Sequence, residues 1–243
     1  MSYSIYICGV GGQGIIKTSV IIGEAAMNQD LDVVMSEIHG MSQRGGSVST
    51  ELKIGEFNSS IIPDTTADML LSFEPIETIR GLHKVNKDSK IVYNTHPIVP
   101  PSINEPYPSV DSITKSLKEN FNHVLPIDAT DFALDAGNIL SLNMVLLGAV
   151  TADDKFPLSK DSVINAMKNN LHERFHDLNI KAIEKELGIS YPTVKKNIDE
   201  LCSALNMKSI ETTDDIDLRE ETKRKLRNGE ITFEDAERIL GEL

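Results

Sequence analysis

The glycine-rich segment near the N-terminus constrains the fold more than any other feature. A short run rich in β-branched and aromatic residues, 3–8, leads directly into Gly9-Val10-Gly11-Gly12-Gln13-Gly14. Residues 15–27 contain alanines and no proline, as expected of a helix, and residues 31–36 read as a second strand. A strand, a glycine turn, a helix and a second strand predict a βαβ opening and a parallel sheet.

Further strands and helices follow with the same alternation. We expect irregular structure in the proline-rich stretch 97–108 and one long apolar helix over 131–150. The pattern predicts a three-layer, Rossmann-like α/β fold with a mainly parallel sheet. The other expected strands are 46–54, 69–73, 90–94 and 123–128, and the other expected helices are 74–82, 109–121 and 159–171.

The last quarter of the chain differs in composition. From about residue 177 onward strand signals vanish and charged helical segments take over. We therefore divide the chain into an α/β domain, 1–185, and a small all-α extension, 186–243. Within the extension, residues 187–196 resemble a helix-turn-helix, and Thr193, Lys195 and Lys196 would face DNA. Because the region is acidic overall, the other interpretation is a solvated helical extension that helps the chain to dimerise or docks on a partner.

Charge and composition exclude several classes of protein. The net charge of −13 argues against broad affinity for nucleic acid or anionic membranes. No apolar run approaches the ~20 residues that span a bilayer, and the N-terminus does not read as a signal peptide, so we expect a cytoplasmic protein. A [4Fe–4S] cluster normally takes four thiolates, and the chain has two cysteines, of which Cys8 reads as a buried, inert thiol. We expect no metal site.

The glycine loop allows two interpretations. Gly9, Gly11 and Gly14 fit the dinucleotide-binding spacing, and Glu37 lies near the position of an acidic ribose ligand, which would suggest an NAD- or FAD-binding enzyme. Alternatively, the glycines provide only a tight turn from strand to helix. The additional Gly12 and Gln13 are not required by a dinucleotide site and favour the second interpretation or another ligand.

A second polar, glycine-rich loop spans residues 37–48. We expect it at the carboxyl end of the second strand, beside the glycine turn, at the sheet edge where ligands and partners dock. Arg44, flanked by small residues, could present its guanidinium to a carboxylate or phosphate, or could pair with Glu37 as scaffold. The candidate anion- or partner-binding residues of the two loops are Gly9, Gly11, Gly12, Gln13, Gly14, Glu37, His39, Ser42, Gln43, Arg44, Gly45 and Gly46.

These loops resemble a known family, the gamma-type domain of pyruvate and other 2-oxoacid:ferredoxin oxidoreductases. The resemblance covers about residues 3–185 in the right order. Within the family, the block 36–48 is most similar to the beta subunit of the indolepyruvate type. The matching segments are 9–15, 37–48, 67–75, 93–95, 128–130, 137–138 and 143–149.

The resemblance implies a division of labour between subunits. The reaction would be oxidative decarboxylation of an aryl 2-oxoacid to aryl-acetyl-CoA, with CoA as co-substrate and ferredoxin as electron acceptor. Thiamine diphosphate, magnesium and [4Fe–4S] clusters would lie on a large partner subunit, in a hetero-oligomer of α2β2 type. This chain would bind no cofactor, contribute no catalytic residue and be inactive alone. A free-standing NAD/FAD-binding oxidoreductase and a ligand-sensing DNA-binding regulator are the alternatives.

Overall fold

The computed structural model describes residues 2–40, 45–99, 107–135, 138–173 and 176–186. The expected helical extension 186–243, with Thr193, Lys195 and Lys196, therefore lies outside the described residues except for its first position. The strands are β1 (Ser2–Val10), β2 (Val33–His39), β3 (Ser47–Gly55), β4 (Ala67–Ser72), β5 (Val85–Asn94) and β6 (His123–Ile127). The helices are α1 (Ile15–Met27), α2 (Pro75–Gly81), η1 (Leu82–Lys84), α3 (Val110–Asn120), α4 (Ala129–Asp135), η2 (Ile139–Ser141), α5 (Leu142–Thr151), α6 (Lys160–Asn170) and α7 (His176–Glu186).

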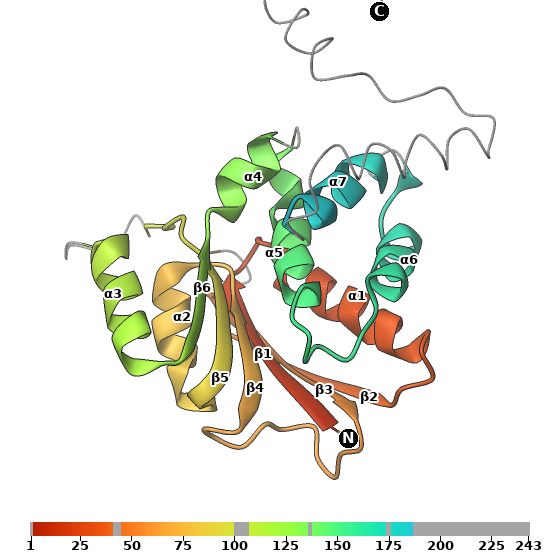
Figure 1. The fold of residues 1–243 in the computed structure, drawn as a ribbon, viewed down its shortest axis with the longest axis horizontal. Helices are drawn as coiled ribbons and strands as arrows, with labels where there is room; N and C mark the ends of the chain where they lie inside the picture. The colour runs from red at the N-terminus through yellow and green to blue at the C-terminus, as the bar shows by residue number, and fades with distance from the viewer. Residues whose placement is uncertain (1, 41–44, 100–106, 136–137, 174–175, 187–243) are drawn as a thin grey trace, which may run out of the picture. The chain divides into compact units, whose positions relative to one another are not determined.

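The six strands form one mixed sheet in the order β2-β3-β1-β4-β5-β6 (Figure 1). β1, β4, β5 and β6 are parallel neighbours, which confirms a mainly parallel sheet. β3 lies between the first two strands and is antiparallel to both, so β1 and β2 run in the same direction without pairing with each other. A βαβ crossover only requires the two strands to run in the same direction, and it leaves room for a third strand between them.

Helices cover both faces of the sheet and give the three layers (Figure 1). On one face, α1, α5, α6 and α7 pack over a large apolar core that includes Ile5, Leu52 and Leu71. On the other face, α2 and α3 cover a smaller cluster around Leu70 and Ile91. The central strands are buried on both sides, which explains their nearly continuous apolar sequence.

Local signals fix where several helices begin. Ser109 and Ser159 cap α3 and α6 by accepting the backbone N–H groups of Ser112 and Ser162, each at 3.2 Å. Helix α2 has proline at its first turn and Glu74 as its N-cap. None of the helices in the described ranges is long and apolar enough to cross a membrane.

The long helix expected over 131–150 is instead two helices, α4 and α5, joined through the short η2. The N–H of Asn138 donates to the carbonyl of Ala133 at 3.0 Å, and the N–H of Ser141 donates to the carbonyl of Asn138 at 2.9 Å. The chain thus closes α4 and turns before α5 begins. Glycine is a poor helix former, and the sequence has one at position 137, between the two helices.

Candidate functional site

The glycine turn joins β1 to α1 at the carboxyl edge of the parallel strands. Gly12 and Gly14 have φ values of 108° and 86°, in the left-handed region that favours glycine. A Cβ on Gly9 would lie 2.8 Å from the Cβ of Phe73, so close packing against the end of β4 requires glycine there. The glycines therefore have steric roles before any ligand is considered.

The Gln13 side chain locks this turn to the rest of the sheet. Its Oε1 accepts the backbone N–H of Val10 at 2.7 Å, and its Nε2 donates to the carbonyl of Phe73 at 2.9 Å. Both ends of the amide are thus used within the protein. Gln13 thus fixes the shape of the turn.

The second loop returns to the glycine turn, as the sequence predicted. The N–H of Gly11 donates to the carbonyl of Gly46 at 2.8 Å, and the N–H of Gly45 donates to the carbonyl of Gly11 at 3.2 Å. The antiparallel β3 makes this contact, since its first residue, Ser47, pairs with Val10. Met41, Ser42, Gln43 and Arg44, including the suggested pair of Arg44 with Glu37, lie outside the described residues.

This geometry does not suit a dinucleotide site of the usual kind. The N–H of Gly11 is bound to Gly46 rather than free for a pyrophosphate. Glu37 and His39 are exposed on β2, which β3 separates from β1, and Glu37 pairs with Thr50. An acidic ribose ligand normally ends the strand next to the glycine loop. The arrangement therefore favours the steric interpretation of the glycines.

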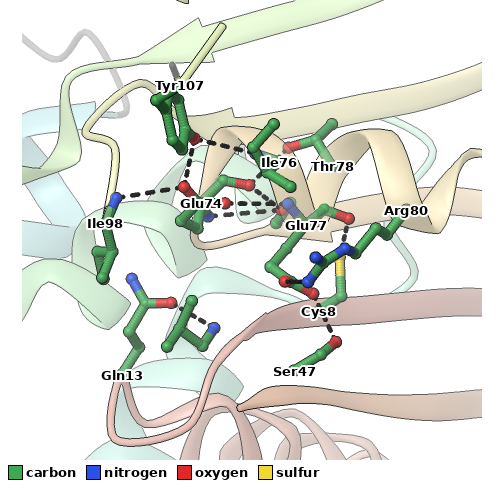
Figure 2. A network of polar contacts seen from close by, with 12 residues as sticks. Cys8, Gln13, Ser47, Glu74, Ile76, Glu77, Thr78, Arg80, Ile98 and Tyr107 are labelled. Carbon is green, nitrogen blue, oxygen red and sulfur yellow. Dashed lines mark hydrogen bonds and ion pairs between the residues drawn. The ribbon is translucent and has the colours of Figure 1, made fainter. Parts of the chain in front are cut away.

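A buried carboxylate, Glu74, ties two further segments to the same edge (Figure 2). Glu74 is 1 % exposed and accepts the N–H of Glu77 at 3.0 Å, the N–H of Ile98 at 3.2 Å and the hydroxyl of Tyr107. Burial, followed by the hydrogen bond to Glu74 and its negative charge, raises the pKa of Tyr107 above its ordinary value. The network holds both ends of the proline-rich segment against the start of α2.

A second buried carboxylate, Glu77, connects α2 to the second loop. Its two oxygens accept the hydroxyl of Ser47 and the guanidinium of Arg80, each at 2.5 Å (Figure 2). Its carbonyl accepts the thiol of Cys8 at 3.2 Å. Burial, with the nearby carboxylates of Glu77 and Glu74, raises the pKa of Cys8 to about 12. Cys8 is therefore the buried, inert thiol that the sequence predicted.

Asn94, at the end of β5, lies at the same edge of the sheet. Its Oδ1 accepts the N–H of Ala129 at 3.1 Å, and its Nδ2 donates to the carbonyl of Phe73 and the hydroxyl of Thr130, both at 3.3 Å. Nearby, a Cβ on Gly14 would lie 3.1 Å from Nδ2 of Asn143 in the first turn of α5. Segments 9–15, 67–75, 93–95, 128–130 and 143–149, which carried part of the family resemblance, thus meet at one edge.

Sequence reasoning missed Glu77 and Tyr107. Glu77 could have been found as the acidic residue in the first turn after Glu74-Pro75, whereas Tyr107 gave no local signal. Among the described residues, no three His, Cys, Asp or Glu side chains come together as metal ligands. The edge therefore offers backbone groups, hydroxyls and amides rather than a ligand set for a metal.

Comparison with protein families matches residues 4–188 to the pyruvate ferredoxin/flavodoxin oxidoreductase family. The chain belongs to this family. A relative within this oxidoreductase family, indolepyruvate oxidoreductase subunit IorB of Methanothermobacter thermautotrophicus, is 54 % identical over 77 % of this chain and 97 % of its own length. The protein of the same name from Pyrococcus horikoshii is 37 % identical over 77 % and 94 %.

Solved oxidoreductase structures share the fold. The gamma subunit of a keto/oxoacid ferredoxin oxidoreductase from Geobacter sulfurreducens has a TM-score of 0.57 at 24 % identity, over 76 % of this chain and 96 % of that subunit. The 2-oxoglutarate:ferredoxin oxidoreductase of Magnetococcus marinus has a TM-score of 0.58 at 20 % identity, over 76 % of this chain and 30 % of that one. Residues 179–208 match a separate helix-turn-helix-type domain of unknown function.

Proposed function

We propose that this chain is the cofactor-free subunit of an indolepyruvate:ferredoxin oxidoreductase. The complex would decarboxylate an aryl 2-oxoacid oxidatively to aryl-acetyl-CoA and pass the electrons to ferredoxin. The observation that carries the proposal is the 54 % identity to a subunit named for indolepyruvate, over nearly the whole of that subunit. The family match over residues 4–188 supports it.

The residues of this chain do not fit the cofactors of such a reaction. The chain has two cysteines, whereas a [4Fe–4S] cluster takes four thiolates. The thiol of Cys8 is buried and donates to the carbonyl of Glu77, so it is not placed to bind iron. We therefore assign thiamine diphosphate, magnesium and the clusters to a large partner subunit in a hetero-oligomer of α2β2 type.

The contribution of this chain would be a docking surface at the carboxyl edge of the sheet. The glycine turn is fixed by Gln13, and the second loop is fixed at its end by Gly46 and Ser47. Glu37 and His39, exposed at the end of β2, would meet the partner or an anionic group of CoA or the oxoacid, together with Ser42, Gln43 and Arg44, which follow them in the sequence. Residues that are already fixed before binding reduce the entropy lost when a partner binds.

Anaerobic reconstitution tests the subunit assignment. The purified chain should be inactive with indolepyruvate, CoA and an electron acceptor, and co-expression with a cysteine-rich, thiamine-dependent partner should yield activity. The control is the same partner without this chain, which should be inactive or much less active. Turnover by this chain alone would contradict the proposal.

Calorimetric titration tests the rival dinucleotide-binding function. Because Gly11 already donates to Gly46, NAD, NADP and FAD should bind no tighter than about millimolar, roughly −4 kcal/mol. Micromolar binding that is lost in a Gly11→Val variant would favour a free-standing oxidoreductase instead.

The match at residues 179–208 supports a separate role for the extension, 186–243. We propose that it is a helix-turn-helix-like unit that either docks on the partner or contacts DNA through Thr193, Lys195 and Lys196. A mobility-shift assay with the full chain at low salt separates the two. Binding that is lost in a Lys195→Ala/Lys196→Ala variant supports DNA contact, and no binding at low salt excludes it.

A further inference from the structure

Within the part of the chain that the structure describes, no strand pairs with the outer edge of β2. β2 is the last strand in the order, and none of its seven residues is buried. Its register with β3 runs without a bulge from Val33 to His39, and it contains neither proline nor lysine. The opposite edge strand, β6, is shorter and contains Pro126. Natural proteins usually guard free edges with proline, lysine or bulges, so β2 has the character of a strand that is covered in the working protein.

Apolar side chains flank this edge on both faces of the sheet. Ile38 is 54 % exposed on the face that carries α2. On the other face, α1 exposes Ile16, Val20 and Met27 to 38, 36 and 59 %. This side of α1 lies beside β2, since a Cβ on Gly23 would lie 4.0 Å from Cγ2 of Val33. Exposed apolar side chains beside an open strand indicate an interaction surface.

We infer that a second copy of this chain covers the edge, with two β2 strands paired antiparallel about a two-fold axis at Ser36. In this register Val34 of each copy lies opposite Ile38 of the other, and Met35 lies opposite Glu37. On the face of the sheet that carries α2, the two apolar side chains of β2 thus meet each other, and no two like charges are directly opposed. A two-fold axis uses the same patch twice and closes the assembly at two copies.

The neighbouring registers are less favourable. Pairing centred on Glu37 places two carboxylates directly opposite each other, which is destabilising. Pairing centred on Met35 places Val34 opposite Ser36 and Ile38 opposite Asp32, so that both apolar side chains of the face that carries α2 meet polar ones. The sequence of β2 therefore selects Ser36 as the centre, and it does so without any contribution from a partner subunit.

Charge gives the dimer a distinctive salt dependence. Each copy carries a net charge of −13, so two copies repel at long range, while the contact itself is apolar and backbone-mediated. Salt screens the repulsion between exposed charges and leaves the apolar contact intact. Dimerisation should therefore strengthen as the salt concentration rises, which is opposite to the behaviour of an interface held by ion pairs.

Sedimentation equilibrium of the full chain tests the inference. The wild-type protein should have twice the 26.8 kDa monomer mass. Ile38→Lys or Val34→Glu alone should weaken dimerisation about tenfold, because each change spoils two symmetric cross-strand pairs worth ~0.2–1 kcal/mol each. Combining Val34→Glu with Ile38→Lys should restore the dimer, since the introduced charges then pair across the axis. Leu125→Lys on β6, where Leu125 is 38 % exposed, is the matched control and should have no effect.

Three results would overturn the inference. The first is a wild-type protein that stays monomeric at all concentrations up to about 0.1 mM. The second is a dimer whose dissociation constant is unaffected by Ile38→Lys and by Val34→Glu. The third is a combined variant that is folded by circular dichroism but dimerises no more tightly than the single variants. The measurement reads mass rather than activity. Its outcome is therefore independent of the proposed oxidoreductase function.

Discussion

Removing the hydroxyl of Tyr107 should measurably destabilise the chain, because this hydroxyl donates to the buried carboxylate of Glu74. A hydrogen bond to a charged group contributes about 1.5–3 kcal/mol net. Tyr107 is half-buried, so water can partly replace its hydroxyl as a donor to Glu74. Tyr107→Phe should therefore lower the free energy of unfolding by about 1–2 kcal/mol. With an m-value of about 2–3 kcal/mol/M, the urea midpoint should fall by about 0.5 M.

Two further variants show whether the carboxylate is the cause. Glu74→Gln can still accept from Ile98 and Tyr107 through one oxygen, but its amide nitrogen would face the N–H of Glu77 and lose the cap, at about 1 kcal/mol. In a double-mutant cycle, Tyr107→Phe and Glu74→Gln should be coupled by about 1 kcal/mol. Tyr3→Phe is the control, since the Tyr3 hydroxyl makes no hydrogen bond with another described residue. If Tyr107→Phe is no more destabilising than Tyr3→Phe, the network does not hold the proline-rich segment.

Three other predictions can be tested by urea unfolding or by assembly. Gly9→Ala should lower the free energy of unfolding by about 1–3 kcal/mol, because the new Cβ would lie 2.8 Å from the Cβ of Phe73. Gly12→Ala, whose Cβ would have no atom within 4 Å, should lower it only by the backbone strain of about 1 kcal/mol. Equal losses in the two variants would contradict the packing argument. Above pH 9 the unfolded thiol of Cys8 ionises while the folded thiol, with a pKa of about 12, stays protonated, so stability should fall by up to about 1.4 kcal/mol per pH unit between pH 9 and 12. Cys8→Ala should reduce this loss of stability at high pH. An unchanged pH profile of the unfolding free energy in Cys8→Ala would contradict the role assigned to the thiol. Arg44→Ala should change the stability of the isolated chain by less than about 1 kcal/mol, but should weaken assembly or substrate affinity about tenfold or more. Arg44→Lys should rescue little of this loss. A lower melting temperature with unchanged activity per folded molecule would instead show that Arg44 has a structural role.

Local patterns predicted most of the elements because their causes are local. The helix predicted over 15–27 has those bounds in the structure, since its periodicity and the preceding glycines act within a few residues. The serine-capped helices α3 and α6 also lie within one residue of their expected ends. The fold class was readable for the same reason, because strands that alternate with helices leave few topologies open.

Sheet order could not be read because pairing is not local. Residues 46–54 were recognisable as a strand, but their alternation does not say which strands lie beside them. In the candidate site, too, local features could be predicted and long-range contacts could not. The glycine turn was readable as a motif, whereas Tyr107 reaches Glu74 across 33 positions and Ser47 reaches Glu77 across 30. No pattern within a short window reports such contacts.

The position of β1 at the centre of the sheet has a consequence for synthesis. Ile5 pairs with Leu52 on one side and with Met69 on the other, so the first strand made is completed only after β4 has left the ribosome. At roughly 5–20 residues per second, this apolar strand waits for several seconds without its neighbours. Both of its ladders close long loops, which slows folding relative to local pairing. The nascent chain should therefore need shielding by a chaperone until about 70 residues have emerged, and a slowly translated stretch before β4 would increase aggregation rather than assist folding.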